Sequence, residues 1–248
     1  MRSHALKNVL APEQLESLRR LSTCAVSNAI EAFEVRLRNA GFVDASIRCM
    51  FPEFPPTIGY AATARVRTSV PPMHGPNYFD RTDWWNAILK IPPPRVVVVE
   101  DVEKRPGLGS FVGEVHANIL SALGCVAVIT NGAVRDLPQV RSTGFQFFAG
   151  NVSVSHAYAH IFQFGTPVEI GGLKIEPGDL LHGDQHGILK VPFEVASNIP
   201  AVARDIQEKE ERAIAICRSA DFSLEKLREV FRSLNPESNA ANTGRVRK

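Results

Sequence analysis

The chain has 248 residues, with 28 Lys and Arg against 26 Asp and Glu, so its formal net charge is +2 at pH 7 with neutral histidines. A chain of this size buries about 70% of its unfolded surface, which is enough for a hydrophobic core without disulfides or structural metals. The balanced charge argues against the broad basic face that is typical of nucleic-acid binders, so we expect no nucleic-acid partner. The sequence shows neither a signal peptide nor a run of 18 apolar residues, and we predict a cytoplasmic protein with no membrane partner.

The cysteines and the end of the chain give further expectations. The 4 cysteines include no C-x-x-C pair, which favours reduced thiols over disulfides. Residues 235–248 are polar and end in basic residues, so they predict a disordered tail. Residues 1–234 contain no internal repeat and no linker, and we predict that they form a single domain.

The first part of the chain predicts two helices and then the first strands of a sheet. Residues 95–101 are an unbroken β-branched run, which is typical of a strand that is buried on both faces. Trp84 and Trp85 are expected to pack in the core. In chain order we predict helices that begin at Pro12 and at Thr23 as a capping residue, a strand at 59–68, a helix at 80–89 and the strand at 95–101.

The middle of the chain predicts a parallel α/β core. Residues 112–123 favour a helix, residues 125–130 a second buried strand, and residues 145–149 a third strand after a short helix that ends at Ser142. A strand, a helix and a strand in this order indicate a parallel crossover. Repetition of this pattern predicts an α/β fold.

The last part of the chain changes character after Val152. Short segments separated by glycine and proline turns predict a β-rich second layer. The apolar spacing then predicts two C-terminal helices. The predicted elements are strands at 167–170, 173–175, 179–182 and 187–191, and helices at 193–216 and 223–233.

A glycine-rich loop and two lysines carry weak functional signals. Residues 107–113 have the spacing G-x-G-x-x-x-G, but a polar insert separates them from the strand, where a dinucleotide or S-adenosylmethionine site needs a tight turn. We therefore interpret this segment as a surface or active-site loop. Lys174 and Lys190 lie in apolar strands and could form a Schiff base, although such lysines usually extend to solvent.

Two histidine groups are weak metal-site candidates. His182, Asp184 and His186 could line one face of a strand, but the glycines around them favour a structural turn. His156 and His160 would align on a helix, yet the glutamate of H-E-x-x-H is missing. We expect these two histidines to line a pocket or the core.

The strongest constellation joins Glu114 to Arg135 and Asp136, which follow it after twenty intervening residues. Glu114 begins a helix after one strand, and Arg135 and Asp136 follow the next strand, so all three are expected at the carboxyl edge of the sheet. A carboxylate there could hold Mg²⁺ or Mn²⁺, and the arginine could bind a substrate carboxylate. The alternative is that Asp136 only caps the following helix while Arg135 forms a surface ion pair.

These residues and two longer segments resemble the RraA-like family, which includes 4-hydroxy-4-methyl-2-oxoglutarate/4-carboxy-4-hydroxy-2-oxoadipate aldolases and oxaloacetate decarboxylases. The resemblance covers roughly residues 10–215. It rests on Gly113-Glu114, on Ile-Thr-Asn-Gly-Ala-Val-Arg-Asp at 129–136, and on Pro-Val-Glu-Ile-Gly-Gly-Leu-Lys-Ile-Glu-Pro-Gly-Asp at 167–179.

The resemblance implies a role for each residue of the constellation. Asp136 would ligate Mg²⁺ or Mn²⁺, and Glu114 would contact a water on that metal. Arg135 would bind a 2-keto acid and the enolate that develops from it. The backbone N–H groups of Val115 and His116, at a helix start, would hold the substrate carboxylate.

The resemblance also implies a three-layer β/β/α swivelling-domain-like fold with N- and C-terminal helices, in a homotrimer or hexamer. Glu211, or Glu208 one turn earlier, would enter the site of the adjacent protomer. The implied activity is metal-dependent C–C cleavage that releases pyruvate from a 4-hydroxy-2-keto acid, or decarboxylation of oxaloacetate. Some relatives are non-catalytic and bind an RNA-degrading endonuclease, and this is the alternative function. The Arg135-Asp136 pair favours catalysis.

Overall fold

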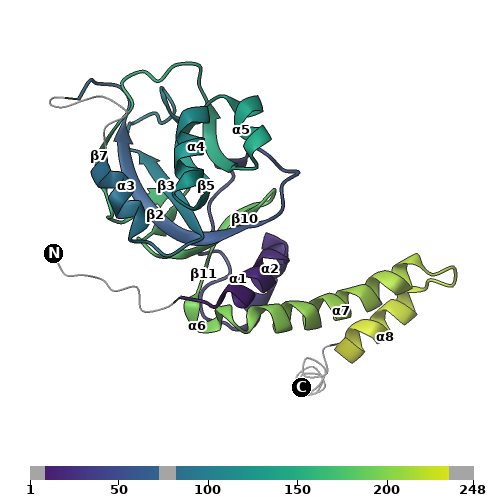
Figure 1. Ribbon diagram of the computed structural model, residues 1–248. Helices are drawn as coiled ribbons and strands as arrows, with labels where there is room; N and C mark the ends of the chain where they lie inside the picture. Colours follow the sequence, from purple (N-terminus) through teal and green to yellow (C-terminus); the bar gives the residue numbers. More distant parts are fainter. Residues whose placement is uncertain (1–8, 73–81, 235–248) are drawn as a thin grey trace, which may run out of the picture.

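The computed structural model describes residues 9–72 and 82–234, and it shows a mixed α/β architecture (Figure 1). The main sheet has the order β1-β6-β5-β3-β2-β10-β11, with β4 paired to β5 and β7 paired to β2. The smaller sheet pairs β8 with β9. The strands are β1 (Arg48–Cys49), β2 (Thr57–Arg67), β3 (Arg95–Asp101), β4 (Ser110–Val112), β5 (Cys125–Val134), β6 (Gln146–Val152), β7 (His160–Phe164), β8 (Val168–Ile170), β9 (Leu173–Ile175), β10 (Leu180–Asp184) and β11 (Gly187–Val191).

Helices cover one face of the main sheet and the β8–β9 hairpin covers the other. Trp84, Ile88, Leu120 and Val140 pack on the helical face, while Ile170 and Ile175 pack on the opposite face. The predicted β/β/α layering is confirmed. The helices are α1 (Pro12–Arg19), α2 (Thr23–Ala32), α3 (Thr82–Leu89), α4 (Glu114–Ala122), α5 (Leu137–Thr143), α6 (Phe193–Ala196), α7 (Ile199–Arg218) and α8 (Leu224–Leu234).

The centre of the sheet is parallel, as the strand and helix order predicted. β2, β3, β5 and β6 run in the same direction. The β-branched run forms β3, in which Val96, Val97, Val98 and Val99 are all buried. β5 continues four residues past its predicted end, because its last residues still pair with β4 and β6. This extension carries the chain to the sheet edge at Arg135.

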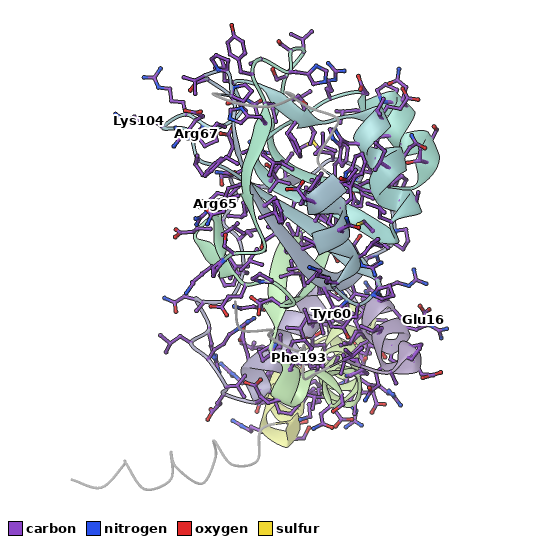
Figure 2. All side chains as sticks on the ribbon, turned by 60° about the vertical axis from the view of Figure 1, so that its left-hand side comes forward. Glu16, Tyr60, Arg65, Arg67, Lys104 and Phe193 are labelled. Atoms are coloured by element: carbon purple, nitrogen blue, oxygen red, sulfur yellow. The ribbon has the colours of Figure 1, made fainter. Side chains whose placement is uncertain are left out.

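The N- and C-terminal helices form the base of the molecule. α2 packs on α7, and α7 packs on α8. The ring of Tyr60 stacks on that of Phe193 at a centroid distance of 6.2 Å, and its hydroxyl accepts a hydrogen bond from Leu10 N at 2.9 Å (Figure 2). In Figure 1, α7 extends from this base away from α4 and α5, and α8 folds back along it.

Three expected boundaries are wrong. Ser22, not Thr23, caps α2, because its hydroxyl accepts the Ala25 N–H at 3.1 Å. The helix expected at 112–123 begins at Glu114, since the preceding residues pair with β5 as β4. The helix expected at 193–216 is divided into α6 and α7.

Strand β7 was not predicted, and two predictions lie partly or wholly outside the described residues. β7 occupies residues for which the sequence predicted no element. The first residues of the helix expected at 80–89 and the predicted tail at 235–248 lie outside the described residues.

Arg95 joins the ends of two helices from inside the core. It is 8% exposed. Its guanidinium donates to three backbone oxygens, those of Ile91 at 2.5 Å, Leu123 at 2.8 Å and Leu89 at 3.3 Å. Because the last carbonyls of a helix have no intrahelical donor, the buried cation satisfies groups that would otherwise be unpaired.

Replacing Arg95 by methionine is therefore expected to lower the free energy of unfolding by about 3 kcal/mol, since charged hydrogen bonds are lost and carbonyls stay buried. Urea unfolding followed by circular dichroism measures this change. Arg38→Met is the control, because the Arg38 side chain is 78% exposed, and it should shift stability by at most about 0.5 kcal/mol. Equal stability of the two variants would contradict the role of Arg95.

Candidate active site

The candidate site forms where β4 and β5 end next to each other. Val112 is paired with Val134 in the parallel register of these strands. The residues that follow, Gly113 and Arg135, are consequently neighbours, and Arg135 N donates to Val112 O at 3.1 Å. The sheet thus places the start of α4 beside the Arg135-Asp136 pair.

The structure joins Glu114 to Asp136 through the main chain. Glu114 N donates to Asp136 Oδ2 at 3.1 Å. The Glu114 side chain is exposed as the first residue of α4. The helix start also carries the N–H groups of Val115 and His116, and the first N–H groups of any helix have no intrahelical acceptor. This end of α4 therefore favours negative charge.

Asp136 has an unusual backbone conformation. Its φ of 56° and ψ of 37° are left-handed, and its side chain makes no capping hydrogen bond to α5. The alternative that Asp136 only caps α5 is therefore wrong. A left-handed L-residue costs about 1 kcal/mol, and it persists where the surroundings over-determine it. Here the carboxylate is turned toward the start of α4 and toward Arg135.

Gly113 lets this carboxylate approach the main chain. A Cβ at Gly113 would collide with Oδ2 of Asp136 and would lie 2.9 Å from Cγ of Arg135. The φ of Gly113 is −141°, which any residue adopts. The position thus needs glycine because of space and not because of backbone strain.

Arg135 lies between Asp136 and a histidine. Its Nε is 3.4 Å from Asp136 Oδ2, and its Nη1 is 3.1 Å from Nδ1 of His156. Nε is buried and has no hydrogen-bond acceptor among the described residues. The Arg135 and Asp136 side chains are 31% and 33% exposed, so solvent reaches the pair.

Sequence reasoning missed His156 as a member of this site. His156 and His160 have helical spacing, but the structure places His160 at the start of β7 and His156 at the start of a turn that the Ala159 N–H closes on His156 O at 3.0 Å. Apart from the presence of a histidine at 156, nothing in the sequence indicates that this residue contacts Arg135. The turn that carries His156 packs against Gly109, where an added Cβ would collide with His156 O.

The His116 side chain belongs to the core. It is 2% exposed, and its ring lies 5.0 Å from that of Phe111 and 6.4 Å from that of Trp84. Burial, together with the charges of His156 and Arg135, lowers its pKa to about 4, against the opposing effect of a hydrogen bond with the Phe111 backbone. The His116 side chain is thus enclosed in the core and does not face the solvent at the candidate site.

The low pKa of His116 predicts acid sensitivity of the fold. The unfolded chain binds a proton at this residue below about pH 6.5, whereas the folded chain does so only near pH 4, so stability falls as the pH decreases between these values. We expect a loss of about 2 kcal/mol from pH 7.5 to pH 5.0 from this residue alone. Urea unfolding at the two pH values should show a smaller loss in His116→Gln. His186→Gln is the control and should lose as much stability as the unmodified chain between these pH values. An equally large loss in His116→Gln would contradict the low pKa of His116.

The other histidine group has a structural role. His182 is fully buried and contacts Thr23 Oγ1 at 3.0 Å and Leu18 O at 3.1 Å. Asp184 accepts the backbone N–H of Thr23 at 2.8 Å and that of His186 at 2.8 Å. The predicted turn is therefore the β10–β11 hairpin, which anchors α2.

The two lysines differ in environment. Lys190 Nζ lies 3.0 Å from Asp179 Oδ2. Lys174 is exposed and lies 3.4 Å from Glu176. Both are paired ammonium groups, so neither has the apolar surroundings that favour a Schiff-base lysine.

Glu208 and Glu211 lie on the exposed face of α7. Glu211 accepts a hydrogen bond from Gln207 at 3.0 Å. In Figure 1, α7 extends away from α4 and α5, and so away from the start of α4 where the candidate site lies. Within residues 9–72 and 82–234, no group of three or more His, Cys, Asp and Glu side chains is arranged to hold a metal.

The profile of the RraA-like family (Aldolase/RraA) matches residues 23–189, which include β4, β5 and the Arg135-Asp136 pair. The chain belongs to the RraA-like family. Among the parts that the structure describes, this RraA-like chain has no helix with the length and apolarity needed to cross a bilayer.

Curated relatives match this RraA-like chain at low identity. A protein of Halalkalibacterium halodurans with the name "Putative 4-hydroxy-4-methyl-2-oxoglutarate aldolase" is 27% identical over 133 residues, which are 52% of this chain and 62% of the relative. Protein DlpA of Legionella pneumophila is 22% identical over 224 residues, 89% of this chain. The chain thus spans 62% and 34% of the lengths of these two relatives.

Solved structures share the fold. A protein of Pseudomonas syringae pv. tomato is 22% identical and has a TM-score of 0.68, covering 89% of this chain and 94% of its own. RraAS2 of Streptomyces coelicolor, described as an unusual member of the RNase ES inhibitor RraA family, is 21% identical with a TM-score of 0.64, covering 82% and 96%. The RraA-like fold expected from the sequence is confirmed.

Proposed function

We propose that this RraA-like protein is a divalent-metal-dependent C–C lyase that acts on a 2-keto acid. It would release pyruvate from a 4-hydroxy-2-keto acid by retro-aldol cleavage, decarboxylate oxaloacetate, or do both. The observation that carries this proposal is the solvent-accessible Arg135-Asp136 pair, in which a buried Nε donor lacks an acceptor. The aldolase name of the Halalkalibacterium relative supports the same class of reaction.

The donor set of the site fits Mg²⁺ or Mn²⁺. Both ions accept carboxylate oxygens and retain water or substrate oxygens as further ligands. Asp136 would hold the ion directly, and the exposed Glu114 would hold a water on it. The ion supplies a Lewis acid for the negative charge that develops on the keto oxygen of the substrate.

Side chains and backbone N–H groups of this chain account for the remaining steps. Arg135 binds the 2-keto acid and shares the developing charge through a planar fork of donors. The Val115 and His116 N–H groups bind the substrate carboxylate at the positive end of α4. In a retro-aldol reaction, a water oriented by Glu114, or by the glutamate of an adjacent protomer, would remove the proton from the C4 hydroxyl. Decarboxylation requires the same charge stabilisation without that base.

A neighbouring copy would complete the site. Glu211, or Glu208, lies on a helix that extends from the body, where it can reach another protomer rather than its own site. We propose a homotrimer, or a hexamer of two trimers, with the site at the protomer interface. In such an assembly a glutamate of the adjacent protomer would join Asp136 and Glu114, since the described residues of one chain contain no group of three or more His, Cys, Asp and Glu side chains that could hold a metal.

Pyruvate release tests the proposal. The purified chain is mixed with oxaloacetate or with a panel of 4-hydroxy-2-keto acids in Mg²⁺, and pyruvate is followed with lactate dehydrogenase and NADH. Because oxaloacetate also decarboxylates in metal solutions, the rate is compared with buffer containing the same Mg²⁺. We expect turnover above this background that is removed by EDTA and by Arg135→Ala.

The matched control is Arg38→Ala, which removes an exposed arginine outside the site and should leave turnover unchanged. If pyruvate release does not exceed the buffer background for any substrate of the panel, the lyase proposal is contradicted and the alternative, a protein-binding regulator, is favoured. Turnover that survives EDTA would contradict the metal requirement.

A further inference from the structure

Arg135 is held from two sides, and one side is provided by a residue that the proposed reaction does not use. Nη1 lies 3.1 Å from His156 Nδ1, while Nε faces Asp136. A guanidinium only donates hydrogen bonds, so His156 Nδ1 accepts, and the ring carries its proton on Nε2. Nη2 of Arg135 makes no hydrogen bond to the residues that the structure describes, which leaves it for a ligand.

The surroundings of His156 favour the neutral ring that this contact needs. Burial and the charge of Arg135 lower the pKa of His156, and the charge of Asp136 acts in the opposite direction. A protonated ring would have no acceptor at Nδ1 and would repel the guanidinium. The contact is therefore consistent with its electrostatic environment.

A hydrogen-bonded turn places His156 beside Arg135. Ser110 N donates to Ser155 O at 2.8 Å, and Ala157 N donates to Ser155 Oγ at 3.0 Å. Ala157 has a φ of 48°, which is left-handed. Because this conformation is disfavoured for alanine, the hydrogen bonds around the turn must maintain it.

The segment at 107–113, expected to be a loop, is a loop only up to Gly109, because Ser110–Val112 form the buried strand β4. The part before β4 packs against the turn. A Cβ at Gly109 would collide with the backbone oxygen of His156 and would lie 2.9 Å from Ala157 Cβ. Ser153 Oγ also donates to Leu108 O at 3.2 Å. The loop that resembled a nucleotide motif thus contacts the His156 turn at a distance that only glycine allows.

We infer that His156 is a positioning residue for Arg135, seated by Gly109, which aims the remaining donors of the guanidinium at the substrate anion. This inference rests on the proposed function, because it takes the 2-keto acid as the ligand of Arg135. An arginine without this support keeps its charge but loses its fixed direction, and supporting residues of this kind affect activity by about 10–100-fold.

The test uses His156→Ala, His156→Asn and Gly109→Ala in the full chain, with His186→Ala as a control on the β10–β11 hairpin. Asparagine places its Oδ1 near the position of His156 Nδ1 and can accept from Arg135. Steady-state pyruvate release gives kcat and KM. Oxalate, a planar dianion like the enolate of pyruvate, is titrated by calorimetry in Mg²⁺ buffer, and thermal unfolding reports folding.

We expect His156→Ala and Gly109→Ala to lower kcat by about 10–100-fold and to weaken oxalate binding. The loss should lie mainly in kcat, because Arg135 faces charge that develops in the transition state. His156→Asn should stay within about threefold of the unmodified protein, because the acceptor is restored.

Two results would overturn the inference. One is oxalate affinity in His156→Ala equal to that of the unmodified chain, and the other is a His156→Asn variant that folds yet is as impaired as His156→Ala. Oxalate binding separates this inference from the proposed function. If oxalate affinity falls in His156→Ala and Gly109→Ala and is kept in His156→Asn, but the unmodified chain releases no pyruvate, the lyase proposal fails and the role of His156 stands.

Discussion

Replacement of Asp136 by asparagine is expected to lower pyruvate release by about 10³-fold or more, which is the scale of losing a preorganised charge in an active site. Asparagine preserves the size of the side chain and an oxygen that can accept the Glu114 N–H, now seen at 3.1 Å. It removes the negative charge that faces Arg135 and that would bind the cation. The measurement is kcat at saturating Mg²⁺.

Asp179→Asn is the matched control for this change. Asp179 also lies beside a cation, with its Oδ2 3.0 Å from Lys190 Nζ, but it has no place in the proposed reaction. Thermal unfolding of both variants separates lost folding from lost chemistry. Turnover in Asp136→Asn within tenfold of the unmodified chain would contradict the role of the carboxylate.

Replacement of Gly113 by alanine is expected to reduce activity by about 10²-fold, because a displacement of about 1 Å in an active site has this effect. The added Cβ would occupy the space of Asp136 Oδ2 and would press on Arg135 Cγ at 2.9 Å. In the proposed mechanism Arg135 contacts the substrate and Asp136 contacts the cation. Pyruvate release and oxalate affinity should fall together.

Gly144→Ala distinguishes this effect from a general loss of stability. Gly144 has a φ of +75°, and a Cβ there would meet no atom within 4 Å. Alanine at this position should cost about 1 kcal/mol of stability through backbone strain, yet it should leave turnover unchanged. If Gly113→Ala retains full activity, the close approach seen at β4 has no functional importance.

The sheet and the location of the site were predictable because they follow from local patterns. The apolar runs that became β3 and β5 could be recognised as buried parallel strands. Arg135 and Asp136 follow such a strand, β5, as expected. Glu114 lies at the same edge, but it follows β4, a strand that the sequence did not predict. The structure adds that the link between Glu114 and Asp136 runs through a backbone N–H.

The details that give the site its geometry depend on contacts between distant segments. No local pattern assigns Asp136 a left-handed conformation, because that conformation is maintained by Arg135 and the start of α4. His156 reaches Arg135 only because Gly109 admits the turn that carries it. Ser22 likewise caps α2 because Thr23 is committed to His182 and Asp184, which are far away in the sequence.

The roles of Glu208 and Glu211 remain predictions, because they require a second protomer. They lie on α7, which in Figure 1 extends away from α4 and α5 and could reach a neighbouring chain. Sedimentation of the full chain with and without Mg²⁺ gives the oligomeric state. Loss of turnover in Glu211→Gln or Glu208→Gln without dissociation would identify the contributing residue.

Binding of Mn²⁺ to the full chain, measured by electron paramagnetic resonance, tests most directly whether a cation lies beside Arg135. We expect one bound Mn²⁺ per chain that Mg²⁺ displaces, with affinity lost in Asp136→Asn and kept in Asp179→Asn. Equal Mn²⁺ affinity of Asp136→Asn and the unmodified chain would contradict it.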